Sequence, residues 1–141
     1  MLNYDLKRFH QAQEPVYLKA LQEIRNGKKE THWMWYMFPQ LAGLGYSETA
    51  KFYAIADLEE ATCFLKDHVL AQRLEALCQA LLEVEGKSAQ EIFGTPDDLK
   101  LRSSMTLFNA VTNSSPLFQQ VLDHYFDGKK DEKTLRLLGF A

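Results

Sequence analysis

The stretch that decides the fold runs over residues 68–85 and reads HVLAQRLEALCQALLEVE. Its apolar side chains recur at intervals of three and four residues, which places them on one face of an α-helix. The members of this stripe are Leu70, Leu74, Leu77, Leu81 and Val84. Shorter stripes of the same period lie within residues 17–24, 58–65, 101–108 and 118–125. Strict alternation over a strand-length window is absent, so the sequence predicts an all-α fold.

Length and composition restrict the class of protein. The chain has 141 residues, of which 46% are hydrophobic and 25% charged, as is typical of a globular domain. A net charge of -3 disfavours non-specific binding to nucleic acid. The N-terminus lacks the pattern of a signal peptide, and the longest apolar run, residues 33–38, is too short to span a bilayer. We therefore expect a cytoplasmic protein without nucleic-acid or membrane partners, in which Cys63 and Cys78 are reduced.

Signals for the starts and ends of helices divide the chain into eight or nine of them. Ser88 followed by Glu91 matches a capping box, as does Asp57 with the acid three residues later. Thr95 is expected to cap a helix whose first residue is Pro96. The predicted helices form one domain over residues 1–141, without significant sheet, and lie near residues 4–12, 15–26, 47–55, 57–66, 68–85, 88–93, 96–110, 116–127 and 131–138.

An aromatic segment, residues 32–40 with the sequence HWMWYMFPQ, departs from this regular pattern. One interpretation is that its rings fill the core between helices, because aromatic side chains dominate core energetics. The other is that Trp33, Trp35 and Tyr36 form apolar walls for a flat ligand such as a base or nicotinamide. In that case His32 and Gln40 supply its polar contacts.

The second departure is the helix over residues 97–108, DDLKLRSSMTLF, which combines basic and hydroxyl side chains. In one interpretation Arg102 pairs on the surface with Asp98, four residues earlier. In the other, Lys100, Arg102 and Ser103 face a cleft and hold a phosphate or carboxylate, for which the rigid guanidinium is well suited.

Motifs for established catalytic chemistry are absent from the sequence. No pair of histidines has zinc-binding spacing, and no P-loop, GxSxG or HExxH motif occurs. We therefore predict no metal site and no cofactor, and the sequence assigns no catalytic residue.

Both unusual segments resemble the DUF1810 family, a group named as a domain of unknown function. The resemblance rests on HWMWY at residues 32–36, on KLRSSMTLF at residues 100–108, and on shorter matches between residues 8 and 135. It implies a mainly α-helical single domain and supplies no catalytic residues. Members of this family are often labelled calpastatin, but calpastatin-type inhibitors are largely disordered, whereas this chain has regular apolar stripes.

A fainter similarity is to the helical NADAR group of N-glycosidases, which act on ADP-ribose-linked nucleotides. That group carries a basic residue, a methionine and a phenylalanine in one helix, a part that Arg102, Met105 and Phe108 could play here. A helix core explains the same spacing.

Together these features favour a small-molecule pocket between residues 33–47 and the helix over residues 100–108. We expect a nucleotide-like or anionic ligand, because aromatic faces and a guanidinium suit one. Arg102 would then point toward Trp33, Trp35 or His32. The alternatives are a protein-interaction or structural domain without a ligand, and an N-glycosidase-type enzyme acting on an ADP-ribose-related nucleotide.

Overall fold

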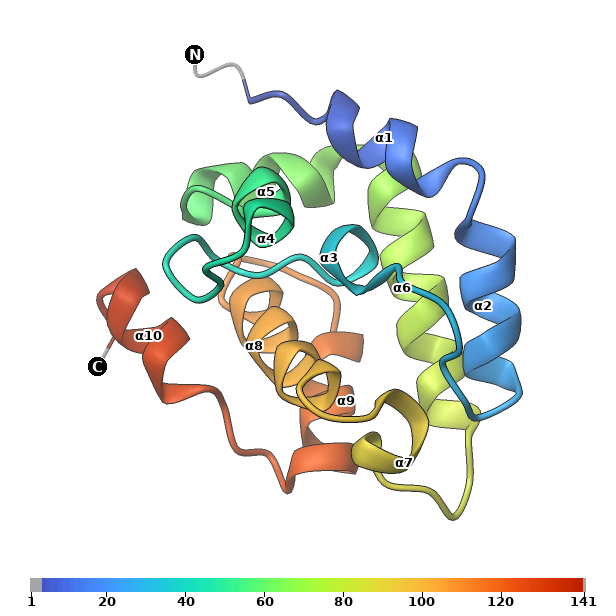
Figure 1. The fold of residues 1–141 in the computed structure, drawn as a ribbon. Helices are drawn as coiled ribbons and strands as arrows, with labels where there is room; N and C mark the ends of the chain where they lie inside the picture. The colour runs from blue at the N-terminus through green and yellow to red at the C-terminus, as the bar shows by residue number, and fades with distance from the viewer. Residues whose placement is uncertain (1–3, 141) are drawn as a thin grey trace.

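The protein is all-helical in a computed structural model that describes residues 4–140 (Figure 1). The prediction of an all-α fold is confirmed, since the described residues contain one isolated bridge, between Leu41 and Ile55, and no sheet. Ten helices follow one another in this part of the chain: α1 (Lys7–Gln13), α2 (Tyr17–Arg25), α3 (Met34–Met37), α4 (Glu48–Tyr53), α5 (Leu58–Lys66), α6 (His68–Glu83), α7 (Ala89–Phe93), α8 (Asp97–Asn109), α9 (Leu117–Phe126) and α10 (Glu132–Leu138).

The helix missing from the sequence prediction is α3, a single turn inside the aromatic segment. Apolar side chains surround this turn without a stripe, so no 3.6-residue period could reveal it. The other nine helices agree with the predicted ranges to within three residues at each end. None of the helices that the structure describes has the length and hydrophobicity needed to cross a membrane.

Helix starts follow the predicted caps with two exceptions. At Asp57 the carboxylate caps α5 by accepting from the Glu60 amide at 2.9 Å, but the predicted capping box is incomplete, because Glu60 accepts from the Ala56 amide instead. The capping box at Ser88 is present, because the Ser88 hydroxyl accepts a hydrogen bond from the Glu91 amide while the Glu91 carboxylate accepts one from the Ser88 amide. The prediction that Thr95 caps α8 is wrong. The helix begins at Asp97, and the amide of Asp98 donates instead to the main-chain carbonyl of Gly94 at 2.9 Å. A main-chain acceptor thus replaces the side-chain cap.

The core forms on the leucine stripe of α6, against which α2, α5 and α9 pack. Four members of the stripe have at most 1% of their surface exposed. Val84 is only partly buried because α6 ends one residue before it. The predicted stripe therefore faces the interior along the whole of α6.

Helix α8 lies in the middle of the molecule, with neighbours on several sides (Figure 1). Its residues from Ser103 to Phe108 are all buried, which fits a helix enclosed by others rather than one at the surface. Two of its hydroxyls bond within the helix, since Ser103 donates to the Leu99 carbonyl at 3.1 Å and Thr106 to the Arg102 carbonyl at 2.8 Å. The buried Ser104 hydroxyl has no hydrogen-bond partner among the residues that the structure describes. The hydroxyl-rich sequence of α8 suits a central position because its side chains are small and allow close packing.

The loop between α3 and α4 is held in place by main-chain pairing. The amide of Ile55 donates to the Gln40 carbonyl and the amide of Ala42 to the Ile55 carbonyl, both at 2.8 Å. A Cβ atom at Gly45 would stand 2.6 Å from the Cβ of Ala50, so only glycine allows this close approach of the loop to α4. The loop therefore has a fixed position next to α8.

Arg8 of α1 fastens the chain segment that follows α4. Its guanidinium donates to the carbonyls of Phe52 at 2.8 Å and Ala54 at 2.9 Å, and lies 3.2 Å from the Glu60 carboxylate. Both side chains of this ion pair are largely buried, at 11% and 3% exposure. Through Ala54 this cluster supports the segment that pairs with Gln40.

Candidate functional site

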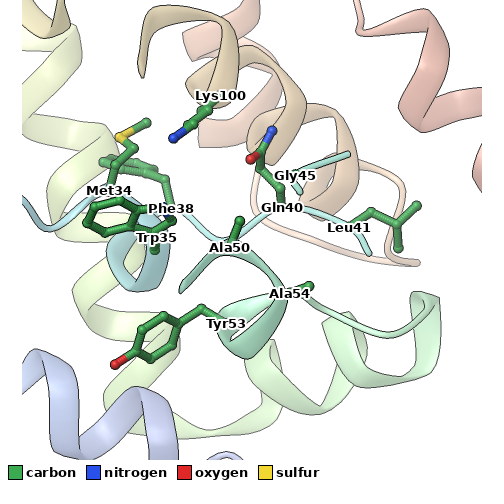
Figure 2. A pocket seen from close by; sticks show the side chains of 10 residues that line it. All are labelled: Met34, Trp35, Phe38, Gln40, Leu41, Gly45, Ala50, Tyr53, Ala54 and Lys100. Atoms are coloured by element: carbon green, nitrogen blue, oxygen red, sulfur yellow. The ribbon is translucent and has the colours of Figure 1, made fainter. Parts of the chain in front are cut away.

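Two adjoining hollows lie where the aromatic segment and its loop approach α8. Figure 2 shows the side chains that line the inner one. Gln40, Gly45 and Lys100 belong to both. The inner hollow, beside Trp35, has a volume of about 10 Å³, enough for one water molecule. The outer hollow is open to solvent and has a volume of about 240 Å³, less than the roughly 300–1,000 Å³ of pockets that bury a drug-sized ligand. Its walls are Gln40, Leu44, Gly45, Pro96, Leu99, Lys100, Ser103, Asp131 and Lys133.

Lys100 connects the two hollows and approaches the aromatic segment. Its Nζ lies 5.4 Å from the centroid of the partly exposed Trp35 ring, within cation–π range. The same Nζ is 3.6 Å from the Asp97 carboxylate. Asp97 is held more closely by Lys29, at 3.0 Å, whose side chain is the more buried of the two lysines. The Lys100 ammonium is therefore only weakly neutralised by Asp97 and can pair with another anion.

Gln40 and Ser103 stand beside Lys100. The main-chain carbonyl of Gln40 is used in the pairing with Ile55. Gln40 lines both hollows, as Lys100 does (Figure 2). Ser103 lines the outer hollow, but it is buried and its hydroxyl is bonded to the Leu99 carbonyl. Of the eight residues predicted for the site, the structure thus brings four together around the hollows: Trp35, Gln40, Lys100 and Ser103.

Trp33 belongs to the core. Its side chain is 0% exposed, and its ring packs at 6.2 Å, centroid to centroid, against those of Phe38 and Phe93. The indole N–H donates to the Glu23 carboxylate at 2.8 Å. The expectation that Trp33 forms a pocket wall is wrong, because its ring is covered by protein on both faces. For this tryptophan the core interpretation is correct.

The carboxylate that holds Trp33 is itself buried and accepts four hydrogen bonds. Besides the indole, its donors are the amides of Glu30 and Thr31, at 2.8 and 3.1 Å, and the Thr31 hydroxyl at 2.7 Å. Burial raises the pKa of Glu23, but these hydrogen bonds to the ionised form outweigh it and bring the pKa to about 2. Glu23 is therefore a structural anion that orients the start of the aromatic segment.

His32 and Tyr36 lie on the aromatic segment but outside the hollows. His32 is exposed, and the Tyr36 ring packs against Tyr53 with centroids 5.3 Å apart. The main-chain carbonyl of Tyr36 accepts a hydrogen bond from Gln13 at 2.7 Å, and burial raises the pKa of its phenol. Within residues 4–140 neither of the two predicted residues lines either hollow.

Arg102 points away from the aromatic segment, contrary to the expectation that it faces Trp33, Trp35 or His32. Its Nη2 donates to the carbonyl of Lys130, which precedes α10, at 3.0 Å. Successive helical residues are about 100° apart, so Arg102 leaves α8 on nearly the opposite side from Lys100. Because Lys100 is the residue of α8 that faces Trp35, the Arg102 side chain cannot face the same ring.

Burial accounts for the spacing that suggested a NADAR-like helix. Met105 and Phe108 are both 0% exposed, and the Met105 sulfur lies 3.6 Å from the Cys78 sulfur in the core. Met105 and Phe108 thus occupy core positions on α8, as the alternative interpretation has it, while Arg102 is only partly buried.

Sequence reasoning missed Lys133 of α10, which lines the outer hollow together with Asp131. Helix α10 packs against α8, and this contact brings a second amine to the same hollow as Lys100. Nothing in the sequence around Lys133 marks it, because the proximity arises from tertiary packing alone. In the part of the chain that the structure describes, no group of three or more His, Cys, Asp or Glu side chains could hold a metal ion.

The chain matches the family model described as "Protein of unknown function (DUF1810)" over residues 3–138, and it belongs to this family. It is also similar to a solved structure, that of the conserved hypothetical protein Rv1873 from Mycobacterium tuberculosis. The two chains are 47% identical and superpose with a TM-score of 0.95, over 98% of this chain and 99% of the other. A comparison with curated proteins found no match. The resemblance to the DUF1810 family is thereby confirmed.

Proposed function

We propose that the protein binds a small anionic or nucleotide-like ligand in the outer hollow, with Lys100 as its principal cation. The observation that carries this proposal is the position of Lys100, which lies over the Trp35 ring at the junction of two hollows that Gln40 also lines. An ammonium group, an amide and an aromatic face together suit a ligand that joins a charged group to a planar one.

The volumes of the hollows indicate which part of the ligand binds first. The inner hollow holds no more than one water, so a planar group cannot reach the Trp35 face while Lys100 stands over it. The outer hollow has room for a compact anion next to the Lys100 amine. We infer that the anionic group binds in the outer hollow and draws Lys100 toward it. This movement uncovers the ring of Trp35 for the rest of the ligand.

Exposed apolar side chains near the outer hollow favour a protein partner as the second candidate. Leu99 lines the hollow with 52% of its surface exposed, and Tyr46, which contacts Lys133, is 76% exposed. Leu137 lies against Gly43 of the loop and is 49% exposed. In this candidate function the lysines form the polar rim of an interface.

For the cellular compartment we propose the cytoplasm. Both cysteines are free thiols, Cys78 being buried and Cys63 partly buried, and reduced cysteines are typical of that compartment.

The ligand proposal predicts that Lys100→Gln weakens binding of a nucleoside monophosphate about fivefold, the upper range for a partly exposed charge pair. A panel of nucleoside mono- and diphosphates, screened by thermal shift and then measured by calorimetry, identifies the ligand to be used. Lys19→Gln, which removes an exposed lysine from α2, is the matched control and is expected to bind like the unmodified protein. If no member of the panel binds, the protein-partner candidate takes precedence. Equal affinities of the Lys100 and Lys19 variants would exclude Lys100 as the principal cation.

A further inference from the structure

A second lysine–aromatic pair stands at the outer hollow. Lys133 Nζ lies 5.8 Å from the centroid of the Tyr46 ring and donates to the Tyr46 hydroxyl at 3.4 Å. Lys133 comes from α10, whereas Lys100, which forms the pair with Trp35, comes from α8. Since both lysines line the outer hollow, two different helices each contribute a lysine to one small space.

The carboxylates at this hollow are committed to other groups. Asp97 forms its shorter ion pair with Lys29, at 3.0 Å, rather than with Lys100, at 3.6 Å. Asp131, which lines the hollow, caps α10 by accepting hydrogen bonds from the amide and the hydroxyl of Thr134, at 3.0 and 2.6 Å. Lys133 has a neutral hydroxyl as its partner. The hollow therefore keeps an excess of positive charge, although Asp131 reduces it.

We propose that the anionic group bound here is a phosphate monoester in its dianionic form, held between Lys100 and Lys133 with the Gln40 amide as a further donor. This inference rests on the proposed function and names the chemical class of its ligand. Two ammonium groups of separate origin match a group that carries two negative charges on three oxygens, whereas a carboxylate or sulfate ester offers one charge. A volume of about 240 Å³ suits a single phosphoryl group with a small organic substituent rather than a dinucleotide.

The present contacts of both lysines are weak enough for their ammonium groups to turn toward a bound phosphoryl group. The Lys133 hydrogen bond to Tyr46 is long, and Lys133 itself is exposed. Lys100 is only partly exposed, but its ion pair with Asp97 is also long. A phosphoryl group can therefore displace both weak contacts without breaking a buried ion pair, since the Lys29–Asp97 pair is separate. Trp35, which lines the inner hollow, and Tyr46, which contacts Lys133, are the aromatic side chains that the two lysines would leave.

The test compares phenyl phosphate with phenyl sulfate, two esters of similar shape that differ in charge at pH 7.5. Affinities are measured by amide chemical-shift titration of the full chain and of the Lys133→Gln, Lys100→Gln and Lys19→Gln variants. We expect the unmodified protein to bind phenyl phosphate about fivefold more tightly than phenyl sulfate. Lys133→Gln should remove most of that preference, Lys100→Gln should weaken both esters, and Lys19→Gln should change neither.

The contrary outcomes distinguish a failure of the dianion inference from a failure of the proposed function. Equal affinity for the two esters, or an unchanged preference in Lys133→Gln, overturns the dianion inference while the proposed anion site stands. If nucleotides of the panel bind and phenyl phosphate does not, the best-binding nucleoside monophosphate, itself a phosphate monoester, is titrated into Lys133→Gln, and an unchanged affinity overturns the inference. Failure of both the esters and the whole nucleotide panel overturns the proposed function together with it. Thermal unfolding of each variant checks that all four proteins are equally folded.

Discussion

Replacing Leu77 with alanine is expected to lower the free energy of unfolding by about 2–5 kcal/mol, the usual range for a fully buried leucine. Leu77 is 0% exposed and stands at the centre of the α6 stripe, on which α2, α5 and α9 pack. The substitution removes apolar contact area and leaves a cavity that surrounding helices fill only in part. Leu74→Ala, at 1% exposure, should cost a similar amount.

Urea unfolding followed by circular dichroism at 222 nm measures this effect. Leu18→Ala is the matched control, because Leu18 lies on α2 with 76% of its surface exposed and should change stability by less than about 0.5 kcal/mol. If Leu77→Ala were as mild as Leu18→Ala, the stripe of α6 would face solvent and the core would be placed wrongly.

Replacing Glu23 with alanine is expected to lower the free energy of unfolding by about 3–5 kcal/mol, because it leaves one buried and three partly buried donors without their acceptor. These donors are the Trp33 indole, the amides of Glu30 and Thr31, and the Thr31 hydroxyl. Glu23→Gln keeps the size of the side chain but replaces one acceptor oxygen by a donor, so it should also destabilise the protein. Glu85→Gln changes an exposed acid after α6 and should have little effect.

The same carboxylate makes stability depend on pH in a defined direction. Burial alone would raise the pKa of Glu23, yet its hydrogen bonds lower it to about 2, below the ordinary 4.5. A lowered pKa contributes stability above the unfolded-state value, and this contribution is lost as the pH falls through the folded-state value. The free energy of unfolding should therefore fall between about pH 5 and pH 2 and fall less steeply in Glu23→Gln. Parallel pH profiles of the two proteins would show that Glu23 is not held as described.

Local signals in the sequence were sufficient for most of the fold. The apolar period and the caps at Ser88 and Asp57 act within one or two helical turns, so they can be read without knowing the tertiary structure. The predictions that were wrong concern features that depend on parts of the chain outside the local pattern. Thr95 loses its predicted role because the Gly94 carbonyl, placed by the preceding turn, takes the amide that it would have capped.

The sequence predicted the candidate site only in part, because the direction of each side chain depends on tertiary packing. The sequence identified the two segments that meet. Within each segment, however, it could not show which of two candidate side chains faces the hollows. Trp35 and Lys100 face the hollows, whereas Trp33 turns into the core and Arg102 toward Lys130. The orientation of α3 depends on packing around Glu23, which no local period records. The contribution of Lys133 depends on the docking of α10 against α8.

The central claim, a ligand site at Lys100 and Trp35, is tested most directly by the two indole N–H signals in a proton–nitrogen correlation spectrum. Trp33 and Trp35 are the only tryptophans of the chain, and Trp35→Phe assigns their signals. Titration with the nucleoside monophosphate that binds best should shift the Trp35 signal saturably and leave the Trp33 signal unchanged, because Trp33 is buried and bonded to Glu23. Saturable binding that moves neither indole signal, or only that of Trp33, would contradict the site.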